Sequence, residues 1–300
     1  MGIISGIIKE KVVLILYRVG IMGDIILDIL LTVDDFPVED SEVILKEETF
    51  RLGGSAFNTA FELSSTELQP LLISTYGKDS AGVFIKEALK KSPIPNTFIF
   101  EEDTNTGKIY ILLSPQGKRT MISSRSKMPI PKDFSVYKQF INNIDWLHVS
   151  GYLLSVKEQY ERAIFAMSQA KKKGVLVSLD PGTNTVKNNS AEIMDALQYT
   201  DYFLPNLEEY HLLKEKTHFD KKTGYPTQII KEGPDGASLL SPTKHLQIPT
   251  NKKLNSTNSI GAGDAFNAGF IFGMLTTNDL IKSCQKGNEF AYHRLFEQTR

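Results

Sequence analysis

From Arg18 onward, short runs of apolar and β-branched residues alternate with longer stretches in which apolar positions recur at helical spacing. This alternation is typical of a parallel sheet with helices on both faces. The predicted strands are residues 19–26, 71–75, 146–150, 175–179, 202–204 and 237–240. The predicted helices are residues 56–65, 81–91, 157–173, 190–198, 207–216 and 264–275. The pattern therefore predicts an α/β fold with a central, mainly parallel sheet.

Two segments, at about 31–52 and 106–125, have no helical period and contain alternating or β-prone residues with Pro, Asp and Gly turns. We expect them to form a small antiparallel sheet. Because each lies between elements of the main sheet, the prediction is one large domain, residues 18–300, that carries a β lid. Residues 1–17 form an N-terminal extension, and the sequence leaves open whether they are an extra strand or a non-native leader.

The composition fits a globular chain with a substantial core, since 41% of the 300 residues are apolar and 23% are charged. A net charge of -1 provides no general attraction for nucleic acid or an acidic membrane. The apolar stretch 12–33 contains Arg18, Asp24 and Asp28, each of which costs about 2.5–3.5 kcal/mol at a bilayer centre. One cysteine and five scattered histidines indicate neither an internal disulfide nor a zinc site. We therefore predict a cytoplasmic protein without nucleic-acid or membrane partners.

The densest chemical signal is the segment 258–270, NSIGAGDAFNAGF. Small residues at Gly261, Ala262 and Gly263 let backbone N–H groups converge, and the following helix adds positive potential at its N-terminus. The segment thus predicts an anion site that suits a phosphoryl group in transfer.

Asp264 needs an explanation, because a carboxylate beside an anion site repels the ligand that the site attracts. One interpretation is that Asp264 is a general base, which accepts the proton of a hydroxyl that attacks phosphorus. The other is that it only complements a helix N-terminus. Taken alone, the residue does not decide between them.

Two further positions suit sugar hydroxyls. Gly54 and Asn58 lie where a glycine pair leads into a helix, and an amide can both donate and accept hydrogen bonds. Asp28 follows an apolar run, and we place it at the end of a strand, where a buried carboxylate needs a partner. The alternatives are a tight turn with a helix-start asparagine for the first pair, and a salt bridge or a turn cap for Asp28.

A third cluster lies after the predicted strand 202–204. Asn206 and Glu209 are three residues apart, so they share a helix face and can support a hydrated Mg²⁺ near phosphate oxygens. The alternative is a variant of the capping box. Gly233 and Gly236 belong to a turn, which faces a nucleotide only in the context of a kinase.

Together these motifs resemble the PfkB, or ribokinase-like, family of carbohydrate and nucleoside kinases from Arg18 to the C-terminus. The residues that carry the resemblance are Gly261-Ala262-Gly263-Asp264, Gly53-Gly54 with Asn58, Gly77-Lys78-Asp79 with Gly82, Asp180-Pro181, and Asn206 with Glu209.

The resemblance implies a sheet flanked by helices, a β lid that often mediates dimerisation, ATP as donor and Mg²⁺. For the chemistry, it implies Asp264 as the base and Gly261, Ala262 and Gly263 as the anion hole. For the ligands, it implies Asp28, Gly54 and Asn58 as acceptor contacts, and Gly233 and Gly236 beside the nucleotide. Asn206 and Glu209 are implied to organise Mg²⁺ and phosphate, with Glu209 acting on the metal indirectly.

Two departures from the family pattern bear on these expectations. Asn258-Ser259 stands where the family usually has Asp-Thr, whose Asp commonly helps to build a monovalent-cation site, and this difference argues against potassium activation. The chain also ends at Arg300, earlier than many relatives, which predicts a reduced adenine wall or cation loop.

The leading hypothesis is an ATP-dependent kinase that phosphorylates a hydroxyl of a sugar or nucleoside. The alternative is a catalytically weak sugar- or nucleotide-binding regulatory protein on the same fold. An NAD oxidoreductase and a Walker-type NTPase are disfavoured, because the chain lacks G-x-G-x-x-G after its first strand and lacks G-x-x-x-x-G-K-[ST]. Phe57, Tyr110 and Met121 are either lid or pocket residues, or ordinary core.

Overall fold

The computed structural model describes residues 17–116, 118–124, 131, 133–217, 225–241, 243–250 and 259–297. Of the predicted extension 1–17, only Tyr17 belongs to these residues, and Asn258 lies outside them.

A nine-stranded sheet forms the body, in the order β13-β12-β11-β10-β9-β8-β1-β4-β5. Its strands are β1 (Arg18–Met22), β4 (Gln69–Gly77), β5 (Ile99–Glu102), β8 (Trp146–Ser150), β9 (Leu176–Asp180), β10 (Tyr202–Phe203), β11 (Thr227–Lys231), β12 (Ala237–Leu240) and β13 (His245–Ile248). All neighbours from β11 to β5 pair in parallel, whereas β12 and β13 add an antiparallel edge. The predicted mainly parallel sheet is confirmed.

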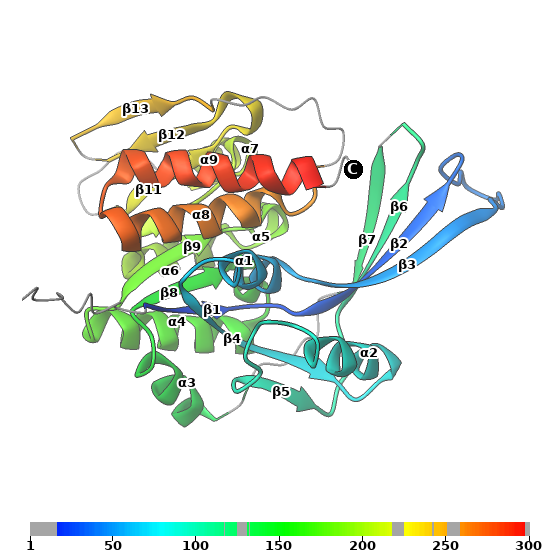
Figure 1. Cartoon of the computed structure of the whole chain (residues 1–300), viewed down its shortest axis with the longest axis horizontal. Coiled ribbons are helices and arrows are strands. Elements are labelled where there is room, and N and C mark those ends of the chain that lie inside the picture. Colours follow the sequence, from blue (N-terminus) through cyan, green and yellow to red (C-terminus); the bar gives the residue numbers. More distant parts are fainter. Residues whose placement is uncertain are drawn as a thin grey trace, which may run out of the picture.

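Helices cover both faces of this sheet, and each face has its own apolar core (Figure 1). One layer contains α1 (Ser55–Leu63), α2 (Ser80–Leu89), α8 (Ala262–Thr277) and α9 (Leu280–Glu297). The other contains α3 (Phe134–Ile141), α4 (Lys157–Lys172), α5 (Thr183–Asn188), α6 (Ser190–Ala196) and α7 (Leu207–Thr217). Within the described ranges, none of these helices has the length and apolar character needed to cross a bilayer.

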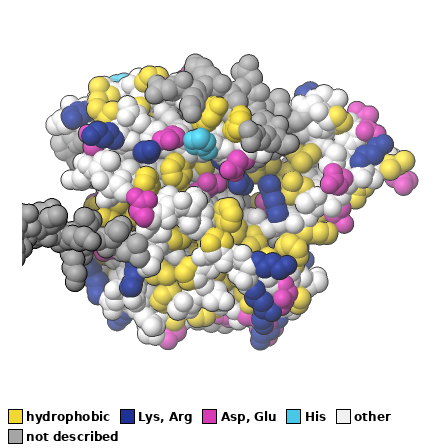
Figure 2. Space-filling view, in the orientation of Figure 1, with side chains coloured by type: hydrophobic (Ala, Val, Ile, Leu, Met, Phe, Trp, Pro, Cys, Tyr) yellow, Lys and Arg dark blue, Asp and Glu magenta, His cyan; other side chains and the backbone are white. Residues whose placement is uncertain are grey.

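A second sheet of four strands projects from the body as the lid (Figure 1). Its strands are β3 (Leu45–Gly53), β2 (Ile26–Val33), β6 (Lys108–Leu113) and β7 (Arg119–Ser124), in that spatial order. Charged side chains of both signs lie along its outer part (Figure 2). The outer pairs are antiparallel as predicted, but β2 and β6 are parallel. They run in one direction because both leave the same end of the body's parallel strands.

The predicted strand 19–26 is wrong in its extent, because β1 ends at Met22 and β2 begins at Ile26. Between them the chain passes from the body into the lid, and buried Asp24 accepts a hydrogen bond from the backbone N–H of Ala56 at 3.5 Å. Asp28 is therefore the third residue of lid strand β2 and not the end of a body strand. A continuous apolar run hides this break, since it contains no turn signal beyond Gly23-Asp24.

Asp79 joins helix α2 to the base of the lid. Its Oδ1 accepts hydrogen bonds from the N–H of Gly82 at 2.8 Å and from Oγ1 of Thr106 at 2.6 Å. A Cβ on Gly82 would lie 1.8 Å from the carbonyl oxygen of Gly77, so only glycine allows this approach. The motif Gly77-Lys78-Asp79 with Gly82 thus fixes where the lid leaves the body.

Replacing Asp79 with Ala removes the cap of α2 and the acceptor for Thr106, so we expect the free energy of unfolding to fall by about 1–2 kcal/mol. Urea unfolding followed by circular dichroism measures this change. Asp103→Ala, at an exposed position nearby, serves as the matched control and should stay within about 0.5 kcal/mol. Equal stability of the two variants would contradict the role given to Asp79.

Candidate active site

A cavity of about 420 Å³ lies between the carboxyl ends of the body strands and the lid. Of the predicted site residues, it brings together Asp28, Gly54, Asn58, Asn206, Glu209, Gly233, Gly261, Ala262, Gly263 and Asp264. Gly236 does not line it. Residues from opposite ends of the sequence thus meet at one edge of the sheet, where ligands bind in open α/β folds.

Asp264 is held between two helices. It is the third residue of α8, and both of its carboxylate oxygens accept hydrogen bonds from α1. Ser55 Oγ donates to Oδ1 at 2.7 Å, and Asn58 Nδ2 donates to Oδ2 at 2.8 Å. The carboxylate is therefore oriented by two side chains while it lines the cavity.

The pKa of Asp264 is raised to about 6, chiefly by burial and also by the nearby carboxylate of Asp180. The hydrogen bonds from Asn58 and Ser55 and the charge of Lys231 act in the opposite direction. A carboxyl group with a pKa just below neutral pH is ionised in most molecules and still accepts a proton readily, as a general base must.

The glycine-rich segment before Asp264 forms the start of α8. Gly261 has φ +77°, a left-handed conformation that favours glycine, and the helix begins at Ala262. The first N–H groups of a helix have no acceptors within it, and a sixteen-residue helix directs its positive dipole end toward the cavity. The segment thus brings a helix N-terminus to the cavity, and the N–H of Ala262 also donates to the carbonyl oxygen of Ser259 at 3.3 Å. Its role as an anion site stays a prediction.

Lys231 is a cation that lies next to Gly263 in this segment, and no role was predicted for it from the sequence. Its ammonium lies 2.7 Å from Oδ2 of Asp180 and 3.3 Å from Oδ1 of Asn267, and a Cβ on Gly263 would be 3.7 Å from it. Burial lowers the pKa of Lys231, but the charges of Asp180, Glu209 and Asp264 outweigh it, so the net pKa is raised. Lys231 therefore remains charged. Asp180 ends β9 and Lys231 ends β11, and ligand sites in open α/β folds lie at such strand ends, so this placement could have indicated the pair from the sequence.

Of the predicted acceptor contacts, Asp28 is 5% exposed and forms an ion pair with Arg51 at 3.4 Å. The salt bridge left open by the sequence therefore exists, although Asp28 also lines the cavity. Gly54 has φ +105° and precedes α1. The side-chain amide of Asn58 donates a hydrogen bond to Asp264, so in this structure Asn58 orients that carboxylate.

Asn206 and Glu209 form a reciprocal cap. Oε2 of Glu209 accepts from the N–H of Asn206, and Oδ1 of Asn206 accepts from the N–H of Glu209, both at 2.8 Å. Oε1 of Glu209 accepts from Oγ1 of Thr183 at 2.8 Å. This is the capping arrangement that the sequence left open. Each oxygen of Glu209 thus accepts one hydrogen bond within the chain. The described residues contain no group of three His, Cys, Asp or Glu side chains arranged to hold a metal.

Several other expectations concern the cavity wall. Gly236 has φ +97°, and a Cβ there would meet the carbonyl oxygen of Ile248 at 2.2 Å, so a glycine is needed in the β11–β12 turn, where it packs against the end of β13. Met121 lines the cavity from the lid and is 52% exposed. Tyr110 lies on β6 and is not among the residues that line the cavity. Arg119 also lines the cavity, and its Nη2 donates to Oγ of Ser259 at 3.1 Å, just before the anion segment.

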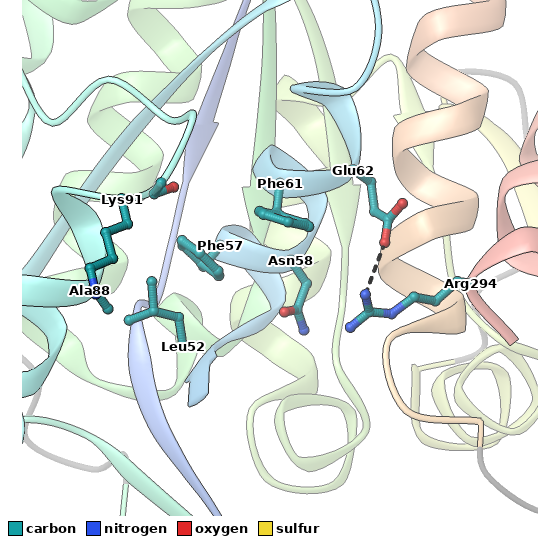
Figure 3. A pocket seen from close by; sticks show the side chains of 9 residues that line it. Leu52, Phe57, Asn58, Phe61, Glu62, Ala88, Lys91 and Arg294 are labelled. Carbon is teal, nitrogen blue, oxygen red and sulfur yellow. Dashed lines mark ion pairs between the residues drawn. The ribbon is translucent and has the colours of Figure 1, made fainter. Parts of the chain in front are cut away.

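A smaller hollow, of about 250 Å³, lies beside α1 (Figure 3). Phe57 and Phe61 line it, and Glu62 pairs with Arg294 of α9 at 3.5 Å. A Cβ on Gly261 would lie 3.3 Å from Nε of Arg294. The C-terminal helix thus supports both α1 and the anion segment from outside. Phe57 is buried among core residues, which agrees with its interpretation as core.

Residues 18–295 match the family described as pfkB family carbohydrate kinase. The chain belongs to this family. It is similar to the ATP-dependent ribose-1-phosphate kinase of Halopiger xanaduensis, at 27% identity over 274 residues that cover 90% of this chain and 89% of the relative. A 2-dehydro-3-deoxygluconokinase of Haemophilus influenzae is 27% identical over 270 residues, which cover 80% of this chain and 84% of that protein. The expected carbohydrate kinase is thereby confirmed, and the family implies ATP as the phosphate donor.

The crystal structure of the nucleoside kinase of Methanocaldococcus jannaschii, an archaeal member of the ribokinase family, has the same fold. Its TM-score is 0.76 at 21% identity, and the match covers 94% of this chain and 92% of that one. This likeness confirms the predicted ribokinase-like architecture of the pfkB chain.

Replacing Lys231 with Met leaves Asp180 buried without its cation, so we expect the free energy of unfolding to fall by about 3–5 kcal/mol. Urea unfolding measures this loss, and Lys214→Met on the exposed side of α7 is the matched control. A loss below about 1 kcal/mol would show that the pair behaves like a surface salt bridge.

Proposed function

We propose that this kinase transfers the γ-phosphoryl group of ATP to a hydroxyl of a sugar or nucleoside, with Asp264 as the general base. The observation that carries the proposal is a half-buried carboxylate, oriented by Ser55 and Asn58, that borders the cavity beside the glycine-rich start of α8. Both catalytic elements thus face one space. The alternative role of Asp264, as a residue that only complements the N-terminus of α8, does not explain why its carboxylate bonds to α1 instead.

In the proposed reaction, the acceptor hydroxyl gives its proton to Asp264 as its oxygen attacks the γ-phosphorus. The new oxygen–phosphorus bond forms, the bond to the β,γ-bridging oxygen breaks, and ADP leaves with that bond's electron pair. The N–H groups at Gly261, Ala262 and Gly263 would stabilise the negative charge that develops on the phosphoryl oxygens. Such preorganised donors contribute about 2.7–4 kcal/mol each to transition-state stabilisation in other enzymes.

The remaining residues position these groups. Lys231 adds a positive charge beneath Gly263, and Asp180 and Asn267 fix its ammonium. The lid supplies Ile109, Ile111 and Met121, which would keep water away from the phosphoryl group. Asp28 and Gly54 would contact acceptor hydroxyls.

Mg²⁺ would neutralise phosphate charge in this reaction. The donors of Asn206 and Glu209 are engaged with each other and with Thr183, so we propose that they act on the ion only through water. Gly233, which lines the cavity, would face the nucleotide, whereas the geometry offers no comparable support for Gly236. A homodimer through the lid stays a prediction.

Replacing Asp264 with Asn removes the proton acceptor but keeps the size of the side chain. We expect kcat to fall by at least about a hundredfold while ATP affinity changes little. A coupled assay of ADP release measures turnover, and calorimetry measures ATP binding. Full turnover in the variant would remove the assignment of the base. A wild-type protein that binds a sugar with ATP but releases no ADP over many hours would instead favour the regulatory alternative.

The pH dependence tests the hydrogen bond from Asn58. Since the active form of Asp264 is the carboxylate, kcat/KM for the acceptor should be lost as the pH falls through about 6. Asn58→Ala removes a bond that favours the charged form, so the midpoint should move to higher pH.

Asn143→Ala is the control for this measurement, because the side-chain amide of Asn143 donates to the carbonyl oxygen of Gln139 in α3 and does not line the cavity, so this variant should keep the wild-type midpoint. An unchanged midpoint in Asn58→Ala would show that this amide does not tune the base.

A further inference from the structure

A second and larger compartment, of about 800 Å³, adjoins the cavity that contains Asp264. The two share Ile109, Met121 and Tyr152, so the inner compartment opens into the outer one past these side chains. The rest of the outer wall consists of Ser123, Ser155, Val156, Thr183, Asn184, Lys187 and Asn189. Pockets for drug-sized ligands have volumes of about 300–1,000 Å³. The space under the lid is therefore larger than a single sugar ring requires.

The boundary between the compartments has flat, apolar walls. On the body side lies the ring of Tyr152, and a Cβ on Gly182 would be 3.1 Å from this ring, so a residue with a side chain there would displace it. Gly182 also has φ +71°, which favours glycine. On the lid side lie Ile109 and Met121, on neighbouring strands. An aromatic face opposite aliphatic side chains suits a planar ring, because every base has a π face that stacks.

The edge of the outer compartment offers amides and hydroxyls. Oδ1 of Asn184 accepts a hydrogen bond from Nδ2 of Asn188, and Asn184 is exposed. Asn189 and Ser123 add a second amide and a hydroxyl. Asparagine amides match the paired donors and acceptors on the edge of a nucleobase.

The charges favour a neutral group in this compartment over an anion. Lys187 is the outer compartment's one cationic wall residue within the described chain, and it pairs with Glu208 at 3.6 Å. Arg119 lies in the inner compartment and donates to Ser259 beside the anion segment. A phosphate or carboxylate on the acceptor would need a cation that is not already engaged in this way.

We infer that the acceptor is a nucleoside, with its ribose in the inner compartment and its base stacked on Tyr152 in the outer one. The inference rests on the proposed function, because it places the reacting hydroxymethyl group at Asp264. In a furanose, this group and the anomeric substituent lie on opposite sides of the ring oxygen. A base on the anomeric carbon therefore extends away from Asp264, toward the outer compartment.

A kinetic comparison of acceptors tests the assignment. Adenosine, guanosine, cytidine and uridine are compared with ribose, ribose 1-phosphate and 2-dehydro-3-deoxygluconate at saturating MgATP, with ADP release and product mass as readouts. We expect at least one nucleoside to have a kcat/KM at least a hundredfold above that of ribose. Tyr152→Ala should lower the ratio of the nucleoside value to the ribose value at least tenfold, and Tyr152→Phe should restore it. Asn96→Ala, an exposed asparagine outside both compartments, should leave the ratio unchanged.

Preferred turnover of ribose 1-phosphate or of a free sugar would overturn the nucleoside assignment while the proposed kinase function stands. An unchanged ratio in Tyr152→Ala would overturn it as well. Calorimetry on Asp264→Asn separates the two proposals. If the wild-type protein releases no ADP with any acceptor, the proposed reaction is refuted. If a nucleoside still binds and Tyr152→Ala weakens that binding tenfold, the outer compartment is supported as the site of the base.

Discussion

The constraint on which this structure depends is a half-buried negative charge, on Asp264, that must be held between two helices at the edge of the cavity. A carboxylate in this position is tolerated because Ser55 and Asn58 donate to it from α1 and because α8 presents its positive end. Both helices must therefore keep their mutual placement. The ion pair of Glu62 with Arg294 contributes to this by tying α1 to α9, which packs along α8.

The charges below Asp264 follow from the same constraint. Asp180 and Glu209 are buried carboxylates whose field raises the pKa of Lys231 and keeps it protonated. Lys231 in turn lowers the pKa of Asp180, against the effect of burial. Each group is thus stable only with the others present, and the cluster holds a fixed cation under the anion segment. Water could not do this as well, because its dipoles would have to reorient during transfer.

How much of this could be predicted from the sequence depends on the range of the interaction. The α/β order, the lid and the local motif at Gly261–Asp264 follow from patterns within a few residues, and the structure has them. The break between β1 and β2 was not predicted, because an apolar run reads the same in a body strand and in a lid strand. Lys231 was not assigned a role, since its partner Asp180 is distant in the sequence and only the parallel sheet brings the two strand ends together.

Asp28 lies at the base of the lid, next to the body. It pairs in register with Arg51 and Ile109, whereas Arg119 lies opposite Leu113 farther out along the same sheet. Only Gly23, Asp24 and Ile25 separate β1 from β2, and all three are buried, so a short and well-packed connection sets the position of Asp28 relative to the body. Asp28, Met121 and Arg119 all line the cavity. The lid therefore borders the cavity with a carboxylate near the body and with a thioether and a guanidinium farther out.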